Sequence, residues 1–176
     1  MRKRKLGNSS LFVSEIAIGS INFGGKVDTS TAIKILDNAY EKGINFVDTS
    51  EVYPTPFSKS NYGKTEQIVG NWIKNKNRDS IVISTKAAGP GEFINWIRNG
   101  KSLHNLKNLR SAVEGSLKRL GTDYIDIFSL NWPDRGINSS DIFFLESKKL
   151  YVLYNESNKG VGLPAEFLYS SSNVFV

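Results

Sequence analysis

The 176-residue sequence contains no cysteine and a single histidine, His104. Without cysteine it forms no disulfide scaffold, zinc ribbon or thiol nucleophile. One imidazole excludes the histidine-rich zinc hydrolases, and we predict no metal site. The sequence also lacks a run of 18 apolar residues, so we predict no membrane span. Its basic start precedes an apolar stretch that Glu15 interrupts, which does not fit a signal peptide, and we expect a cytoplasmic protein.

The composition that remains is typical of a folded domain. Hydrophobic residues make up 39% and charged residues 23%, and the 15 glycines and 5 prolines are too few for a low-complexity chain. The net charge of +6 is compatible with nucleic acid or with an anionic cofactor. Because the Lys and Arg residues are scattered rather than clustered, we expect no nucleic-acid partner.

The character of the sequence changes near residue 135. Residues 1–135 carry 20 Lys or Arg and 13 Asp or Glu, whereas residues 136–176 carry 3 and 4. The second segment is rich in Ser, Asn, Tyr and Phe and has no regular hydrophobic alternation. We therefore predict a folded unit over residues 1–135 and an irregular tail over residues 136–176.

Short apolar strands alternate with amphipathic helices in the first segment. The pattern predicts a hairpin over residues 2–13, strands at 16–18, 44–47, 80–84 and 124–130, and helices from 28 to 43, 65 to 75 and 105 to 119. This order is typical of an α/β fold with a parallel sheet covered by helices. An open doubly wound sheet and part of a (β/α)₈ barrel both fit, and in both the functional residues gather at the carboxyl ends of the strands.

Polar residues follow the predicted strands. Gly19 and Ser20, Asp48 and Lys86 lie at three successive strand ends, and Tyr53 lies five residues beyond Asp48. An ammonium group near a phenol stabilises the phenolate and lowers the phenol pKa from about 10. Such a phenol gives a proton to a carbonyl oxygen as hydride reaches the carbon. Each residue alone is more often a cap, a solvated lysine or a core tyrosine, and their conjunction is what predicts an active site.

Five sequence blocks within residues 2–135 resemble successive segments of the aldo-keto reductase family. They are RKRKLGNSSLFVSEIAIGSINFGG, AYEKGINFVDTSEVYP, GKTEQIVGNWI, IVISTKAAGPG and LRSAVEGSLKRLGTDYIDIFSLNWPDR. The nearest branch is the bacterial oxidoreductases with an extended loop after the third strand. The resemblance implies a TIM-type (β/α)₈ barrel, truncated here to its first four or five βα units after an N-terminal β-hairpin. It also implies an enzyme that binds NADPH and reduces small aldehydes or ketones.

The resemblance assigns roles to individual residues. Tyr53 is the general acid, Lys86 is the partner that lowers its pKa, and Asp48 is the supporting carboxylate. Where the family has the histidine of HWPDR, this sequence has Asn131. Asparagine donates a hydrogen bond but carries no charge, so we expect weakened carbonyl reduction or a changed reaction. We expect His104 to be a solvated loop or capping residue that does not replace the missing histidine.

The same resemblance implies that Gly19, Ser20 and Asp48 contact the cofactor. Residues 150–155 resemble a fifth-strand segment in which a Ser-Asn pair holds the nicotinamide amide, although Asn155 alone matches that pair. This makes residues 136–176 a candidate for a degenerate fifth βα unit. An open barrel edge would favour self-association. The alternative function is that of a catalytically inactive, truncated or regulatory relative.

Overall fold

The structure is a computed structural model that describes residues 1–132. An antiparallel hairpin of β1 (Lys3–Lys5) and β2 (Phe12–Ser14) opens the chain, as predicted. The second sheet is parallel and contains, in spatial order, β3 (Ala17–Gly19), β4 (Phe46–Asp48), β5 (Val82–Ala87) and β6 (Ile127–Leu130). The predicted domain boundary at residue 135 and the tail over 136–176 lie outside the described residues.

Three helices connect the parallel strands, and capping residues mark their ends. They are α1 (Thr29–Glu41), α2 (Lys64–Ile73) and α3 (Leu106–Leu120). The Asp28 side chain accepts a hydrogen bond from the Thr31 amide at the start of α1, and Gly121 ends α3 in the left-handed conformation. Short 3₁₀ turns, η1 (Arg78–Ser80), η2 (Glu92–Ile94) and η3 (Ile97–Gly100), complete the connections.

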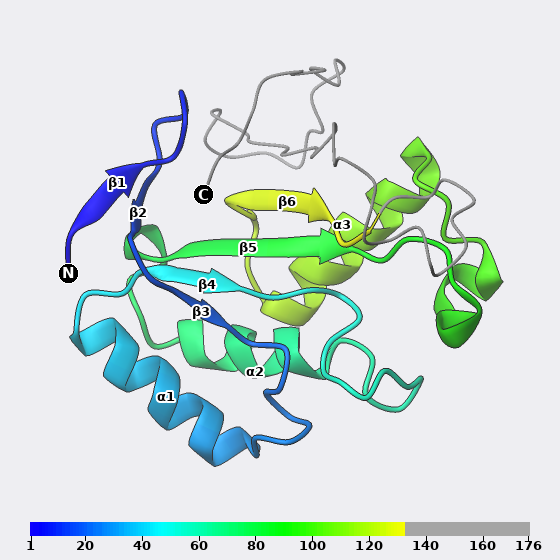
Figure 1. The fold of residues 1–176 in the computed structure, drawn as a ribbon, viewed down its shortest axis with the longest axis horizontal. Coiled ribbons are helices and arrows are strands. Elements are labelled where there is room, and N and C mark those ends of the chain that lie inside the picture. The colour runs from blue at the N-terminus through cyan, green and yellow to red at the C-terminus, as the bar shows by residue number, and fades with distance from the viewer. Residues whose placement is uncertain (133–176) are drawn as a thin grey trace, which may run out of the picture.

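The strand order distinguishes the two architectures that fit the sequence. A doubly wound sheet reverses its order at a switch point and has helices on both faces. Here each strand lies beside the next one in the chain, and the three helices cover one face (Figure 1). This is the order of a (β/α)₈ barrel, of which the described residues form part.

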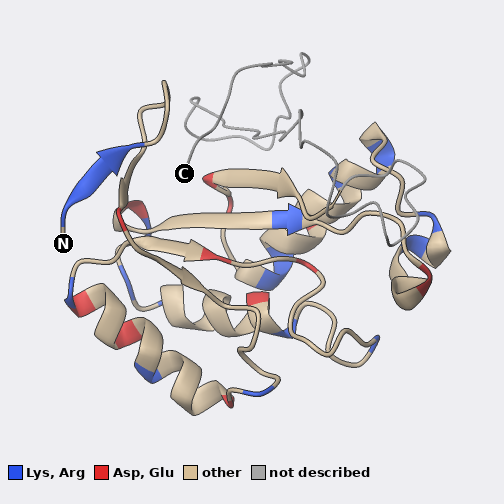
Figure 2. Ribbon diagram, in the orientation of Figure 1, with Lys and Arg blue, Asp and Glu red and all other residues tan. Residues whose placement is uncertain are grey.

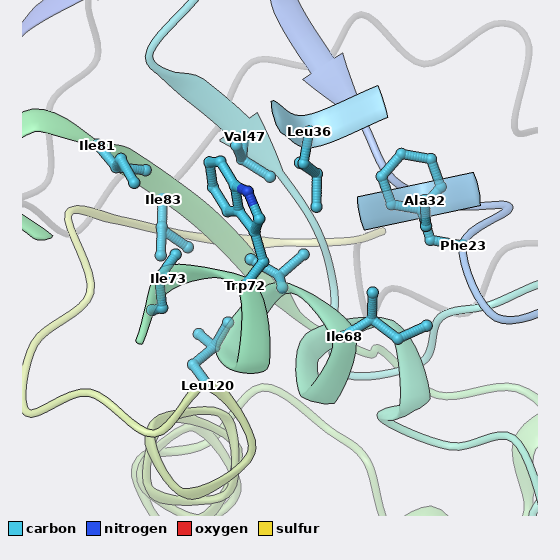
Figure 3. Close-up of a cluster of buried hydrophobic side chains, with 11 residues drawn as sticks. Phe23, Ala32, Leu36, Val47, Ile68, Trp72, Ile73, Ile81, Ile83 and Leu120 are labelled. Atoms are coloured by element: carbon cyan, nitrogen blue, oxygen red, sulfur yellow. The ribbon is translucent and has the colours of Figure 1, made fainter. Parts of the chain in front are cut away.

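The main core lies between the sheet and its helices (Figure 3). Leu36 of α1, Trp72 of α2 and Leu120 of α3 pack there against Val47 and Ile83 of the sheet. Trp72 is 5% exposed and its indole N–H donates to Asp37 at 2.9 Å, so Trp72 is a packing residue. Burial of each large side chain stabilises the fold by roughly 1.5–3 kcal/mol.

The hairpin covers the other face of the sheet near the amino ends of its strands. Val13 of β2 packs against Val82 and Ile127, while the Asn45 carboxamide bonds to the backbone of Phe12 and Ser14. We call this end of the sheet the floor, and the end at which β3–β6 finish the rim. Within residues 1–132 no strand pairs with the outer edge of β6, and self-association through that edge stays a prediction. In the same residues no helix has the length and apolarity to cross a membrane.

Candidate active site at the rim

An ion pair joins two of the predicted catalytic residues at the rim. The Lys86 ammonium donates to Asp48 Oδ2 at 2.6 Å and to the Thr49 carbonyl at 2.8 Å. Figure 2 shows the basic segment near the arrowhead of β5 and the acidic segment of β4 on two neighbouring strands. The Lys86 side chain is 17% exposed and that of Asp48 is 33% exposed. The structure thus brings these two groups together in a partly enclosed position.

Tyr53 lies beside this pair but is not hydrogen-bonded to it. The Lys86 nitrogen is 5.4 Å from the centre of the Tyr53 ring, and the described hydrogen bonds of that nitrogen go to Asp48 and Thr49. Burial, followed by the negative charge of Asp48, raises the pKa of Tyr53 above its ordinary value. In this arrangement Lys86 is engaged by the carboxylate and burial dominates the net shift, so the lowering of the Tyr53 pKa by Lys86 stays a prediction.

Asn131 also reaches the rim. Its amide N–H donates to the Ala87 carbonyl at 2.9 Å and continues the pairing of β5 and β6 beyond the strands. Its side-chain nitrogen donates to Ser50 Oγ at 3.1 Å, two residues beyond Asp48. A carboxamide has two N–H bonds, so one donor remains for a ligand at this point.

The predicted cofactor residues fall into three groups. An added Cβ on Gly19 would meet no atom within 4 Å, so the space above this strand end is open. Ser20 is fully buried, and its hydroxyl and amide both donate to the Asp48 carbonyl, at 2.7 and 3.0 Å. Ser20 therefore fixes the position of Asp48, and its contact with a cofactor stays a prediction. Asn155 lies outside the described residues.

Trp132 anchors the segment that follows β6. Its indole N–H donates to the Pro90 carbonyl at 2.9 Å, and its backbone carbonyl accepts a hydrogen bond from His104 Nε2 at 2.7 Å. His104, half-buried in the loop before α3, is thus part of this anchor rather than a solvated residue. A row of neighbouring rings runs from Tyr53 through Phe57 and Phe93 to Trp132, with centroid separations of 6.5, 6.1 and 5.6 Å.

A buried carboxylate that the sequence analysis missed lies between Asp48 and Tyr53. Glu51 is fully buried and accepts hydrogen bonds from the Ala88 amide, the Tyr62 hydroxyl and both terminal nitrogens of Arg98. The available signal was an acidic residue inside the motif DTSEVYP, two residues before the tyrosine. Its partner Arg98 lies in a loop whose path the sequence pattern does not predict.

Comparison with known sequences identifies one family for this chain. Residues 15–150 match the family model described as the aldo/keto reductase family. The chain is 39% identical over 140 residues to protein tas of Escherichia coli (strain K12), an alignment that covers 78% of this chain and 40% of tas. It is 37% identical over 132 residues to the uncharacterized oxidoreductase YrpG of Bacillus subtilis (strain 168), covering 74% of this chain and 40% of that relative.

Solved structures agree with the sequence comparisons. The holo form of aldo-keto reductase AKR11C1 from Bacillus halodurans aligns with a TM-score of 0.57 and 34% identity, over 73% of this chain and 39% of that one. A thermostable aldo-keto reductase, Tm1743, in complex with the inhibitor epalrestat aligns with a TM-score of 0.61 and 25% identity, over 78% of this chain and 45% of that one. The chain belongs to the aldo/keto reductase family. It spans 40% of the length of tas and of YrpG.

Proposed function

We propose that this chain is an NADPH-dependent oxidoreductase that reduces small aldehydes or ketones at the rim. The observation that carries the proposal is the convergence of three groups that are distant in the sequence. Asp48 and Lys86 form a 2.6 Å ion pair, and the ring of Tyr53 lies 5.4 Å from the same ammonium. A carboxylate, an ammonium and a phenol at one end of a parallel sheet are suited to protonating a carbonyl oxygen.

Each of these residues has a distinct part in the proposed reaction. NADPH, when bound, supplies hydride to the carbonyl carbon. Tyr53 donates its hydroxyl proton to the carbonyl oxygen, and the positive charge of Lys86 stabilises the phenolate that remains. Asp48 holds the Lys86 ammonium in position. Asn131 uses its second amide N–H to bind the carbonyl oxygen, the part that the family histidine would otherwise play.

We place the nicotinamide ring of the cofactor above Gly19. The observation that supports this position is that a Cβ added to Gly19 would meet no atom within 4 Å outside the neighbouring residues of the chain. Asp48, one-third exposed, borders this space through the pairing of β3 with β4, in which Gly19 is the partner of Asp48. These residues would hold the reacting end of the cofactor, and the preference for NADPH over NADH is part of the proposal.

The test separates cofactor binding from turnover. NADPH binding is measured by the change in its fluorescence, and NADPH consumption is then followed with a panel of small aldehydes and ketones. We expect binding with slow turnover, and Tyr53→Phe should abolish turnover while binding is kept. Tyr124→Phe is the matched control, because Tyr124 bonds to Asp79 at the floor. Binding without turnover by any substrate would favour the inactive or regulatory alternative, and absence of both would refute the proposal.

A further inference from the structure

We propose that Glu51 is a positioning residue. It fixes the position of Tyr53 relative to Lys86 by binding both the segment at the end of β5 and the η3 turn. This inference rests on the proposed function, because it assumes that Tyr53 is the proton donor. Glu51 touches neither the Tyr53 hydroxyl nor the Lys86 ammonium in the described hydrogen bonds. It acts through the backbone that carries those two side chains.

The carboxylate of Glu51 has donors from three separate segments. The Ala88 amide, two residues beyond Lys86, donates to Oε1 at 2.6 Å. Arg98 of η3 donates through its two terminal nitrogens, at 2.8 Å to Oε1 and 3.0 Å to Oε2. The Tyr62 hydroxyl, just before α2, donates to Oε2 at 2.7 Å. Glu51 is fully buried and accepts four hydrogen bonds, so its position is strongly restrained. Hydrogen bonds to a charged group are stronger in the protein interior than in water.

The backbone of this segment is bound to the lysine strand as well. The Glu51 amide donates to the Lys86 carbonyl at 3.2 Å, and Ser50 Oγ donates to the same carbonyl at 3.3 Å. The loop that carries Tyr53 therefore attaches to β5 at the Lys86 carbonyl, two residues before the carboxylate contact with the Ala88 amide. If the Glu51 side chain is removed, the short connection from Asp48 to Tyr53 keeps its backbone contacts but loses its attachment to the loop after β5.

Arg98 has a backbone conformation that indicates a specific requirement for this contact. Arg98 and Asn99 have φ angles of +49° and +55°, in the left-handed region of backbone conformation that residues other than glycine rarely adopt. The Arg98 guanidinium also donates to the Ala88 carbonyl at 2.9 Å, so Arg98 binds both Glu51 and the residue that Glu51 binds. The strained turn is thus held where it completes the enclosure of Glu51.

The pair of Arg78 and Asp126 at the floor provides a comparison. It is also a mostly buried arginine–carboxylate pair, with a separation of 2.6 Å. Asp126 accepts from the Ile83 amide just as Glu51 accepts from the Ala88 amide. A purely structural role for Glu51 predicts that the two pairs behave alike when broken. A positioning role predicts that the environment of Tyr53 responds to one pair and not to the other.

The experiment measures the pKa of Tyr53 in the full chain by NMR, with ¹³C at the phenol carbon of tyrosine and the Tyr53 signal assigned with Tyr53→Phe. The charged or titratable groups near Tyr53 are Asp48 of β4 and Lys86 of β5, with Tyr62 in the same buried cluster. The variants are Glu51→Gln, Glu51→Asp and, as the control, Asp126→Asn. The signal of Tyr124 at the floor reports in each spectrum whether the chain is folded.

We expect Glu51→Gln to lower the pKa of Tyr53 by about 1, a tenfold change in the ratio of phenolate to phenol, because a loosened loop admits water to the ring. Glu51→Asp keeps the negative charge, but its side chain is one methylene shorter and no longer reaches all of the donors. This variant should lower the Tyr53 pKa by at least half as much as Glu51→Gln. Asp126→Asn should leave the Tyr53 signal unaltered.

Three results would overturn the proposal. They are an unchanged Tyr53 pKa in Glu51→Gln, a change in Glu51→Gln that is absent from Glu51→Asp, and an equal change in Asp126→Asn. The second would assign the whole effect to the charge of Glu51. Turnover provides a further measurement, in which Glu51→Asp should lower kcat at least tenfold with the Kd for NADPH within twofold. The Tyr53 titration needs no turnover, so failure of the proposed function is recognised separately.

Discussion

The rim and the floor are the two ends of the same four strands, and they differ in how completely their polar groups are paired. At the floor, Arg78 donates to two carbonyls, to Thr122 and to Asp126. Within residues 1–132, four buried side-chain atoms lack a hydrogen-bond partner: Thr49 Oγ1, Trp96 Nε1, Arg98 Nε and Ser102 Oγ. All four belong to the loops that follow β4 and β5 at the rim.

This difference is informative because unpaired buried polar atoms are costly and rare in folded proteins. At the floor, apolar packing by Val13 and a fully paired Arg78 serve stability. At the rim, charged groups and loops with incomplete pairing are retained, which is typical of a functional end of a parallel sheet. If function and stability divide between the two ends, substitutions at the rim should change turnover and substitutions at the floor should change the free energy of unfolding.

The largest expected effect is on turnover, from Lys86→Met. Loss of the ammonium removes the charge that stabilises the Tyr53 phenolate and leaves Asp48 without its partner. We expect the rate of NADPH-dependent carbonyl reduction to fall by about 10²–10⁴-fold. Steady-state NADPH oxidation measures this, with the unfolding midpoint in urea as a control. Undiminished turnover in this variant would remove Lys86 from the proposed mechanism.

A substitution at the floor should lower the stability of the fold rather than turnover. In Asp126→Ala, the mostly buried Arg78 loses its carboxylate partner, and the Ile83 amide loses its acceptor. We expect the free energy of unfolding to fall by about 3 kcal/mol, because breaking a buried pair leaves an uncompensated charge. Denaturant unfolding measures the loss. A large fall in the affinity for NADPH with unchanged stability would contradict the division between the two ends.

Restoring a histidine at the rim should have a smaller effect. Asn131→His provides a side chain that binds the carbonyl oxygen and carries charge, at a position that the structure brings next to Ser50. We expect turnover to rise about tenfold, equivalent to about 1.4 kcal/mol in the activation barrier. Steady-state kinetics on a chain already shown to bind NADPH measures it. If turnover does not rise, the departure from the family motif at this position is not what limits the reaction.

The smallest expected effect concerns alkaline pH. Burial, followed by the charge of Glu51, raises the pKa of Tyr62, and burial raises that of Tyr124 to about 12. A raised folded-state pKa means that the protonated phenol favours folding, so stability is complete below about pH 10 and falls as pH rises further. Tyr62→Phe should remove about 1 kcal/mol of the loss between pH 9 and 11, because in that range the phenol titrates in the unfolded chain and stays protonated in the folded one. Urea unfolding at both pH values measures this, and an equal loss of stability in Tyr62→Phe and the unaltered chain would contradict the raised pKa of Tyr62.

Much of the fold could be predicted because its signals are local. Caps such as Asp28 and Asn105 mark helix starts within one turn, and apolar runs mark the strands. The errors come from long-range contacts. β6 begins at Ile127 rather than 124 because the carbonyl of Tyr124 and the carboxylate of Asp126 bind Arg78. β5 continues through Lys86 to Ala87, where its pairing with β6 holds it extended.

The positions of the site residues could also be predicted, but their interactions could not. Asp48, Lys86 and Asn131 follow from the rule that parallel strands end at one edge. The separation of Tyr53 from the Lys86 ammonium and the pairing of Glu51 with Arg98 depend on loop paths. Those paths are set by tertiary contacts and by unusual backbone angles, which hydrophobic patterns do not encode.

The packing of the hairpin against the floor has a consequence for biosynthesis. Val13 leaves the ribosome early, whereas its apolar neighbours Val82 and Ile127 are translated much later. Such contacts between distant segments form slowly, and their surfaces stay exposed in the meantime. The apolar side chains of the hairpin therefore stay exposed on the nascent chain until β6 has been translated. We expect chaperones to bind the chain during this interval.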